Sequence, residues 1–468
     1  MWNGLAMLFS CGSPTTESDP VTACASAPGW SEADGVLRSW CTGCHASALP
    51  ISLRQGAPLG VDFDTYAGAS HWASRIAVRA SQLGDMPPAA GMPDADRQLL
   101  ADWVACGATG TSASIPSECG AATDVGPLAL DAAGAVAWCE AGFGAVDGDL
   151  VWTGEGAIDC LCDVAGSLTV ESGTLEAPRL TRVGGAVTLT GGFNAANLAE
   201  VASLAVGPGG LVETLQLSSL ATVEGDLLVR SGPERLDLPR LTEVGGDFVV
   251  EGVDGLVAID GLDGLIHVGG SLRWEGLPAV DVLPGLRALT FVGGDVVWME
   301  LGAPYWPTLG SLQAMDGSLV LSGGEATMLT VGPLLGWVGG DVVIEHLPSL
   351  ADVDALGALT AVGGGVQIAS LPSLETVAMF AVLATAGSLV VEDVDPITGI
   401  VLPLTDLSGG LTLHGNDGLL DLDGLSQLGH VGGDVVVTDN TALPEAEIEV
   451  WLAGVAVDGV VVRAGNGL

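Results

Sequence analysis

The segment CTGCH, residues 41–45, has the plainest chemical meaning in this chain. Two thiols three residues apart, followed directly by an imidazole, form the C-x-x-C-H pattern of covalent haem attachment. In that chemistry Cys41 and Cys44 form thioethers to two vinyl groups on one edge of a porphyrin, and His45 ligates the iron. With nine Cys and six His in 468 residues, chance alone would give the pattern only about 0.002 times. We therefore expect one covalently bound haem c.

A sixth iron ligand is expected downstream of this motif. Met86 precedes two prolines, which lack backbone N–H groups and stiffen a loop that must present a thioether. We therefore expect Met86 to ligate the iron opposite His45. Met92, which also precedes a proline, and His71 are the alternatives.

Other uses of the Cys41 and Cys44 thiols remain open. A structural zinc site needs four nitrogen or sulfur ligands, and the sequence contains no second C-x-x-C and no H-x-x-x-H at zinc spacing. A thioredoxin-like pair would need a βαβ setting that the flanking residues do not suggest. A structural disulfide between the two thiols is the third alternative.

Two helices are expected to bracket the motif. The first, residues 31–40, has Ser31 as N-cap and Asp34 three residues on, a variant of the capping box. The second begins near residue 94 and can end at Gly107. Both have apolar residues at helical spacing, and these residues are Val36, Leu37, Trp40, Leu99, Leu100, Trp103 and Val104.

Residues 24–108 resemble a small monohaem class I cytochrome c in the CTGCH motif, the Met-Pro loop and the two bracketing helices. The resemblance implies an all-α haem domain. If Met86 fills the sixth position, no open site remains for oxygen or peroxide, which favours an electron carrier over an enzyme. Because the chain has one C-x-x-C-H only, electrons must arrive from and leave to a redox partner.

The N-terminus carries an export signal in this interpretation. The apolar run MWNGLAMLFSCG resembles the lipobox of bacterial lipoproteins, in which cleavage before the cysteine leaves Cys11 to carry the lipid, although an ordinary secretory signal remains an alternative. Residues 12–23 are polar and predict a flexible tether. Since no later window of about 18 apolar residues follows, we expect membrane contact through the lipid anchor only. The protein would be an outer-membrane or cell-surface lipoprotein, or periplasmic.

The remaining cysteines agree with export. Setting aside Cys11, Cys41 and Cys44 leaves an even number, which suits up to three disulfides in an oxidising compartment. These six are Cys24, Cys106, Cys119, Cys139, Cys160 and Cys162. We expect Cys24 to pair with Cys106, because the two bracket one domain. Cys160 and Cys162 share one face of a strand, so we expect each to bond to Cys119 or Cys139.

The rest of the chain is a repeat. The phrase VGGD or a variant recurs at spacings of 21 to 24 residues between positions 225 and 433, a period typical of solenoids. A ladder that steps by three, Leu347, Leu350, Val353, Leu356, Leu359 and Val362, argues against a long helix. The Gly pairs would allow tight turns and positive φ. Neighbouring coils must supply the core.

Residues 138–468, with LPSLADVDALGALTAVGGGVQIASLPSLETV as a typical stretch, resemble the receptor L-domain family, a leucine-rich-like β-solenoid. We expect a multidomain protein: a small all-α cytochrome c domain, a linker at residues 109–137, and a mostly parallel β-solenoid of repeats about 23 residues long. A terminal cap around Trp451 should cover the last coil.

The charge limits the partners. The chain has 13 basic and 57 acidic residues, a formal charge of −44, so nucleic acid would be repelled and a redox partner would be basic. Equivalent aspartates should cap turns rather than bind calcium, because serines interrupt the series and the motif G-G-x-G-x-D is absent; they are Asp226, Asp247, Asp295, Asp341 and Asp434. The histidines of the repeat fall in different phases and should be surface or core residues, and they are His267, His346, His414 and His430.

Two functions of different kinds follow. The first is an exported electron carrier whose solenoid docks a partner. The second is a recognition or structural solenoid protein in which the haem domain is accessory or redox-sensing. The sequence does not name the ligand of the solenoid.

Overall fold

The computed structural model divides the chain into two compact units, Met1–Ser117 and Glu118–Leu468. The described residues are 28–46, 72–82, 92–106, 122–207, 215–353, 356–377 and 379–468, with the single positions 49, 54, 57, 63, 64, 69, 86, 119 and 212. The expectations for Cys11, residues 12–23, Cys24, His71 and Gly107 lie outside these residues. Each unit is described separately.

The first unit is helical in its described part. It contains α2 (Trp30–Trp40), α4 (Ala73–Ile76), the π-helix η2 (Ala77–Gln82) and α5 (Asp94–Ala105). Helix α2 begins one residue earlier than predicted, so Glu32 takes the third helical position and its carboxylate accepts the Gly29 N–H at 2.9 Å. The expected pairing of Ser31 with Asp34 is therefore wrong, and Asp34 instead forms an ion pair with Arg38 at 2.7 Å.

Helices α2 and α5 pack against each other. The rings of Trp30 and Trp103 lie 6.0 Å apart between centroids, and the Trp40 indole donates to Asp96 at 2.8 Å. The buried side chains between the helices are apolar, as the helical stripes predicted. They are Ala33, Val36, Leu37, Phe63, Ala69, Ala73, Ile76, Ala80, Met92, Leu100 and Trp103.

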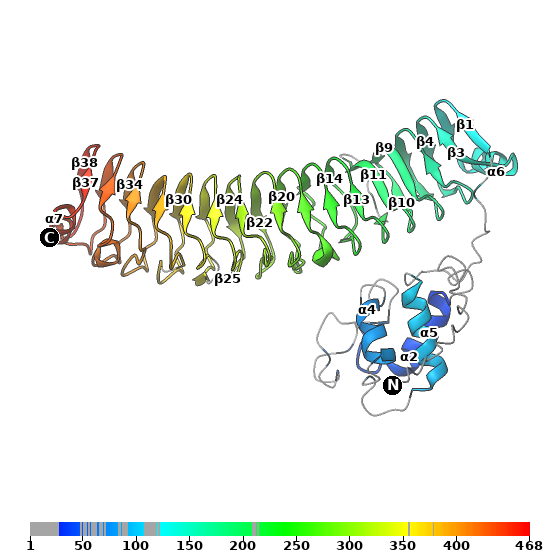
Figure 1. The fold of residues 1–468 in the computed structure, drawn as a ribbon, viewed down its shortest axis with the longest axis horizontal. Helices are drawn as coiled ribbons and strands as arrows, with labels where there is room; N and C mark the ends of the chain where they lie inside the picture. The colour runs from blue at the N-terminus through cyan, green and yellow to red at the C-terminus, as the bar shows by residue number, and fades with distance from the viewer. Residues whose placement is uncertain are drawn as a thin grey trace, which may run out of the picture. The chain divides into compact units, whose positions relative to one another are not determined.

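The second unit is a parallel β-solenoid (Figure 1). Its longest strands stack one per coil, because each pairs in parallel with the equivalent strand of the next coil. They are β2 (Leu128–Leu130), β4 (Leu150–Thr153), β7 (Leu168–Ser172), β9 (Arg182–Leu189), β11 (Glu200–Val206), β14 (Leu227–Val229), β17 (Phe248–Glu251), β20 (Leu272–Leu277), β22 (Val296–Leu301), β24 (Leu319–Gly324), β27 (Val342–Glu345), β30 (Gly365–Ala369), β32 (Ser388–Glu392), β34 (Leu411–His414), β36 (Val435–Thr438) and β38 (Val461–Ala464).

A second stack consists mostly of short strands that precede the long strand of the same coil. It comprises β1 (Ala122–Val125), β3 (Phe143–Asp147), β6 (Asp163–Val164), β13 (Thr222–Val223), β16 (Glu243–Val244), β19 (His267–Val268), β21 (Phe291–Val292), β23 (Ala314–Met315), β26 (Trp337–Val338), β29 (Ala361–Val362), β31 (Thr385–Ala386), β33 (Asp406–Leu407), β35 (His430–Val431) and β37 (Ala456–Val457). Strands β9 and β11 run through both stacks.

Smaller pairings and helices complete the coils. The remaining strands are β5 (Gly156–Ala157), β8 (Thr174–Glu176), β10 (Gly192–Asn194), β12 (Leu215–Gln216), β15 (Arg235–Asp237), β18 (Ala258–Asp260), β25 (Met328–Leu329) and β28 (Asp352–Val353). The helical segments are α6 (Ala132–Glu140), η3 (Leu262–Gly264), η4 (Asp423–Leu425) and α7 (Glu445–Leu452).

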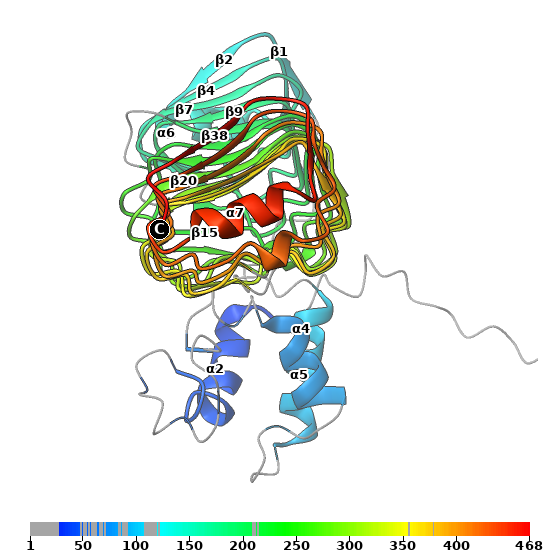
Figure 2. The same ribbon diagram turned by 90° about the vertical axis from the view of Figure 1, so that its left-hand side faces the viewer.

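The core runs along the inside of the coils as continuous aliphatic ladders. The predicted ladder from Leu347 to Val362 is buried at all six of its positions. At the C-terminal end, α7 lies across the last coils (Figure 2), and Ile448 and Trp451 of this helix are buried. The Trp451 indole donates to the Leu425 carbonyl at 3.2 Å, so the predicted cap around Trp451 is present.

Glycine is required at the Gly pairs because neighbouring coils approach each other closely there, and not because the backbone has positive φ. A Cβ added at Gly269 would lie 2.1 Å from the carbonyl oxygen of Gly245 in the preceding coil. These corner glycines do not have positive φ, so that expectation is wrong for them. Positive φ occurs instead at the corner after the long strand, at Gly252 and Gly276 and also at non-glycine residues such as His346 (φ 54°).

The solenoid begins before the position that the repeat pattern indicated. Strands β1 and β2 lie within residues 109–137, the expected linker. Their parallel pairing with β3 and β4 makes them part of the first coils. The repeat phrase is absent there, so periodicity did not reveal them.

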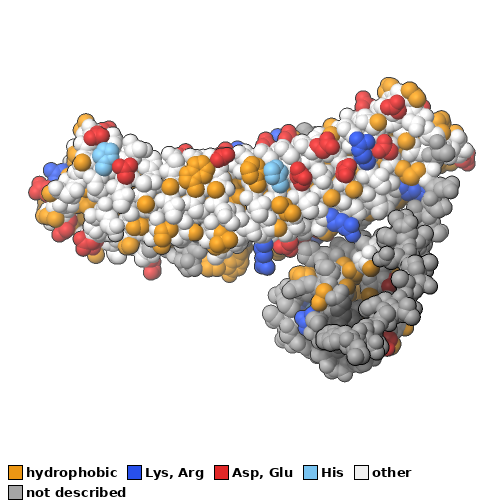
Figure 3. Space-filling model, in the orientation of Figure 1, with side chains coloured by type: hydrophobic (Ala, Val, Ile, Leu, Met, Phe, Trp, Pro, Cys, Tyr) orange, Lys and Arg blue, Asp and Glu red, His pale blue; other side chains and the backbone are white. Residues whose placement is uncertain are grey.

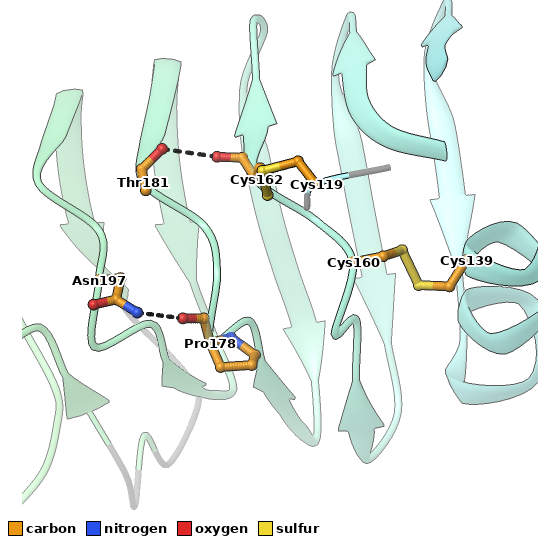
Figure 4. Close-up of a disulfide and its surroundings, with 7 residues drawn as sticks. All are labelled: Cys119, Cys139, Cys160, Cys162, Pro178, Thr181 and Asn197. Carbon is orange, nitrogen blue, oxygen red and sulfur yellow. Dashed lines mark hydrogen bonds between the residues drawn. A yellow bond between two sulfur atoms is a disulfide. The ribbon is translucent and has the colours of Figure 1, made fainter. Parts of the chain in front are cut away.

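Two disulfides lie in these first coils (Figure 4). They join Cys119 to Cys162 and Cys139 to Cys160, which agrees with the expectation that Cys160 and Cys162 bond to these partners and not to each other. Cys106 is also disulfide-bonded. Disulfides of this kind are typical of extracellular or periplasmic proteins. In the part of the chain that the structure describes, no helix is long and apolar enough to cross a membrane.

Candidate functional site

The CTGCH segment forms a turn directly after α2. Cys41 caps the helix, and its N–H donates to the Leu37 carbonyl at 2.7 Å. The N–H groups of Cys44 and His45 both donate to the Cys41 carbonyl, at 3.1 and 3.0 Å. The turn therefore brings both thiols and the imidazole of the predicted site onto one short backbone segment.

Cys41 and Cys44 carry free thiols. Burial of the Cys41 thiol, with a smaller contribution from Cys44, raises the pKa of Cys41 to about 11. The thiol is therefore protonated at neutral pH. The other described cysteines, five in number, are all disulfide-bonded, so the two thiols of the motif are the exception among the cysteines that the structure describes. The alternative of a structural disulfide between Cys41 and Cys44 is wrong.

The His45 ring is held beside the aromatic ring of Phe63. The two ring centroids lie 4.5 Å apart with an interplanar angle of 18°, and the Phe63 N–H donates to the His45 carbonyl at 2.8 Å. Phe63 is buried and belongs to the helical core. The orientation of His45 is thus fixed by a residue 18 positions downstream, which sequence spacing alone did not indicate.

The two methionine candidates differ in burial. The Met92 side chain is 4% exposed and packs in the apolar core between the helices. Met86 is half-buried, and its N–H donates to the carbonyl of Arg79, in η2, at 3.2 Å. The Met92 thioether is therefore already used in packing, while Met86 is the methionine with an accessible side chain.

Two arginines support this region, and the sequence analysis missed both. Arg54 is 0% exposed, and its guanidinium donates to the carbonyl of Ala46, the residue after His45, at 2.8 Å. Arg97 donates to the carbonyls of Met92 at 3.2 Å and Met86 at 3.5 Å. For Arg54 the available signal was an arginine among small and apolar residues in the sequence, because such a side chain donates to backbone carbonyls when it is buried; Arg97 lies within α5 and had no such signal.

The described residues contain no group of three or more His, Cys, Asp or Glu side chains that could hold a metal ion. A zinc site at Cys41 and Cys44 would need further ligands of these types. Haem attachment does not, because it uses two thiols and one imidazole from the protein at this turn. The two thiols and the imidazole on the CTGCH turn are the protein groups that haem attachment would use.

The aspartates of the solenoid cap the next coil. Asp226, Asp247 and Asp341 accept backbone N–H groups of the following coil at 2.9, 2.7 and 2.7 Å. Ser271 takes the same role through its hydroxyl, which accepts the N–H of Asp295 at 3.1 Å. The turn-capping interpretation is confirmed for these residues, and the series forms a hydrogen-bonded ladder along the coils.

The four histidines of the solenoid lie on separate coils. His267 and His430 are each the first residue of a short strand and so occupy equivalent places in the repeat, and the expectation of different phases is wrong for this pair. His267 stacks on Phe291 with centroids 4.6 Å apart. His430 lies between Asp406, at 2.8 Å, and Asp458, at 3.2 Å. Hydrogen bonds that the protonated imidazole donates to these two carboxylates raise the pKa of His430. These contacts join neighbouring coils and form no metal cluster within the described residues.

No family model, no curated protein and no solved structure matches this chain. The residues of the two units therefore have to carry any proposal about function.

Proposed function

We propose that the N-terminal unit is a c-type haem domain that transfers electrons, in an exported and lipid-anchored protein whose solenoid docks a redox partner. The observation that carries the proposal is the state of the cysteines. Every other described cysteine is disulfide-bonded, whereas Cys41 and Cys44 stay free on the turn that also holds His45. Haem attachment requires free thiols at this place, because each one adds across a vinyl group with its proton transferred to the vinyl carbon.

The residues of the unit would have the following roles. Cys41 and Cys44 would hold the porphyrin through thioethers, and His45 and Met86 would bind the iron. A bound haem supplies a reversible one-electron couple, which the protein tunes through its ligands and their surroundings. Stacking on Phe63 orients His45.

Two arginines hold the backbone beside the proposed iron ligands. Arg54 anchors the backbone after the motif, at the Ala46 carbonyl. Arg97 ties the Met86 carbonyl to the start of α5. Both guanidiniums therefore hold main chain next to a proposed ligand, which limits its movement when the iron changes charge.

Electron transfer is favoured over catalysis because two protein ligands on the iron leave no position for a substrate. The disulfides support export, and an exported lipoprotein beginning at Cys11 would stay at a membrane surface without a transmembrane helix. The charge of −44 favours a basic redox partner and disfavours nucleic acid.

The test is the absorption spectrum of the full chain, produced with a c-type haem maturation system, before and after reduction with dithionite. We expect sharp reduced bands and retention of the haem after denaturation, because thioethers survive unfolding. The double variant Cys41→Ala/Cys44→Ala should be colourless with an unchanged circular dichroism spectrum. A colourless wild-type protein would contradict the proposal.

The axial ligand has its own matched pair of variants. Met86→Leu should abolish the weak long-wavelength band of a methionine–iron bond in the oxidised protein and lower the reduction potential, because the thioether stabilises the reduced iron. Met92→Leu, an apolar exchange in the core, should retain both properties. The reverse pattern would move the ligand to Met92.

A recognition or structural role of the solenoid is the second candidate. It is favoured by the extent of the second unit, Glu118–Leu468. If the colourless double variant bound the same partner as the haem-loaded chain with equal affinity, recognition would be the main activity and the haem domain would be accessory or redox-sensing.

A further inference from the structure

The outward side chains of the short strands form a row along the solenoid, one per coil. Parallel pairing aligns His267 with Phe291, and aligns Ala314, Trp337 and Ala361 with one another. Strand β21 contacts β23, so the row is continuous. Phe291 is 44% exposed and Trp337 41% exposed. We name Phe291, Ala314, Trp337 and Ala361 the tryptophan row.

The indole of Trp337 is left uncovered by its neighbours in this row. Ala314 precedes it and Ala361 follows it, and an alanine carries only a methyl group. The ring lies close to Gly339, two residues further along the chain, because a Cβ added at Gly339 would be 2.8 Å from the indole Cη2. Neighbouring strands of a parallel sheet are about 4.8 Å apart. Phe291 is two coils away from Trp337, so the two aromatic positions are separated by about 9.6 Å.

An exposed aspartate lies on the coil next to Trp337. Asp316 follows β23 as Gly339 follows β26. Its backbone carbonyl oxygen is 2.5 Å from the point where a Gly339 Cβ would be placed, and the Trp337 Cη2 is 2.8 Å from the same point. Asp316 is exposed. The main chain of an exposed aspartate therefore borders the exposed indole of Trp337.

The surrounding sequence lacks positive charge. The chain contains no lysine, and residues 288–462 contain 22 Asp and Glu but no Arg. Earlier coils are different, because arginines there form ion pairs, such as Arg230 with Glu251 at 2.5 Å and Arg273 with Glu275 at 3.5 Å. The whole tryptophan row lies in the stretch without arginine. In Figure 3, acidic and apolar side chains are interspersed along the solenoid face.

We propose that the tryptophan row and Asp316 dock a cationic, arginine-rich segment of a partner protein. A guanidinium can stack on the face of an indole and at the same time donate to a neighbouring carboxylate. Trp337 supplies the indole, and Asp316 on the neighbouring coil supplies an exposed carboxylate. The chain has no Arg or Lys between Arg287 and Arg463 that could occupy them.

Charge complementarity selects this occupant over others. A second copy of the chain would bring a further charge of −44 to the interface, which opposes association. A neutral glycan could stack on Trp337 but would gain little from the uncompensated carboxylates. The proposal does not depend on haem, because the tryptophan row belongs to the solenoid.

The experiment measures the affinity of the full chain for an amidated peptide of alternating Arg and Gly at physiological ionic strength. Trp337→Ala should weaken binding about three- to five-fold, the effect expected for one exposed cation–π contact. Trp337→Phe should restore part of the loss. Tyr305→Ala is the matched control, since Tyr305 is 65% exposed and pairs with Met328 outside the short-strand stack; it should bind like the wild type.

A second pair of variants separates the local carboxylate from the net charge. Asp316→Asn and Glu325→Gln each remove one exposed charge, but only Asp316 borders the indole. We expect Asp316→Asn to weaken binding more than Glu325→Gln. A peptide of alternating Glu and Gly should not bind.

Several results would overturn the proposal. Equal losses for Trp337→Ala and Tyr305→Ala, or for the two charge variants, would show non-specific attraction to an acidic chain. Retention on insoluble cellulose or chitin that depends on Trp337 and that the arginine peptide does not compete with would assign the row to a glycan. A dimer in sedimentation velocity that Trp337→Ala dissociates would assign it to a second copy. The haem-free double variant should behave like the wild type, which separates this test from that of the proposed function.

Discussion

Replacing the corner glycine Gly269 by alanine tests the idea that close stacking explains the Gly pairs. The added Cβ would lie 2.1 Å from the Gly245 carbonyl oxygen and 2.8 Å from its carbonyl carbon. Carbon–carbon contacts normally lie at about 3.5 Å or more, so the Cβ would overlap the carbonyl carbon by about 0.7 Å, and it would lie closer still to the oxygen. Both contacted atoms are backbone, so no side-chain rotation can relieve it.

The loss of stability depends on which backbone must move to relieve this overlap. The Gly269 N–H donates to the Val244 carbonyl at 2.8 Å, and the Gly293 N–H of the next coil donates to Val268 at 3.0 Å. Separating the coils at this corner would weaken both hydrogen bonds. Overpacking of this kind costs about 1–3 kcal/mol, and the smaller backbone freedom of alanine in the unfolded chain returns about 0.4–1 kcal/mol. The middle values of the two ranges give an expected net loss of about 1.3 kcal/mol in the free energy of unfolding.

Guanidinium denaturation followed by circular dichroism measures this loss. Gly255→Ala is the matched control, because a Cβ at Gly255 meets nothing within 4 Å and its φ is not positive. Its stability should be unchanged or slightly raised. Since each coil contacts only its neighbours, hydrogen exchange in Gly269→Ala should increase first in the coils beside residue 269. Equal midpoints for the two variants would refute the stacking argument.

Two further predictions concern contacts between coils. Asp406 and Asp458 raise the pKa of His430, so folding favours the charged form of its imidazole. The stability that this charged form adds is complete below the ordinary histidine pKa of about 6.5, and it is lost as the pH rises through the raised pKa. The melting temperature of the wild type should therefore exceed that of His430→Gln most at about pH 5.5 and least at about pH 9, and a constant difference would contradict this. Replacing Cys139 and Cys160 by alanine removes a cross-link with a sequence separation of 21 residues. The loss of this loop constraint on the unfolded chain should lower the free energy of unfolding by about 3 kcal/mol. Hydrogen exchange should show lost protection in the first coils, and unchanged protection would argue against the prediction.

The sequence predicted the features that depend on local spacing. The CTGCH motif lies on one turn because its residues are adjacent in the chain, and the buried ladder from Leu347 to Val362 followed from its period of three. The aspartate caps at Asp226 and Asp341 also followed from their equivalent places in the repeat. Within a short segment, the backbone leaves few arrangements, so residue type and spacing are sufficient.

Contacts between distant residues needed the tertiary structure. Phe63 beside His45, and Arg54 at the Ala46 carbonyl, come from loops without periodicity. The first strands β1 and β2 lack the repeat phrase and are recognisable only by their pairing with the next coil.

The sequence by itself determined that this chain repeats, which residues point inward, and which thiols adjoin a histidine. Only the tertiary structure decided that the Gly pairs serve stacking, that Cys119 bonds to Cys162, and that Trp337 lies uncovered between two alanines. The physical reason is the same for all three. Each depends on which residue of one coil lies beside which residue of another, about 23 residues away for the stacked positions and 43 for the disulfide, and that register is set by the stacking of the coils rather than by any local pattern.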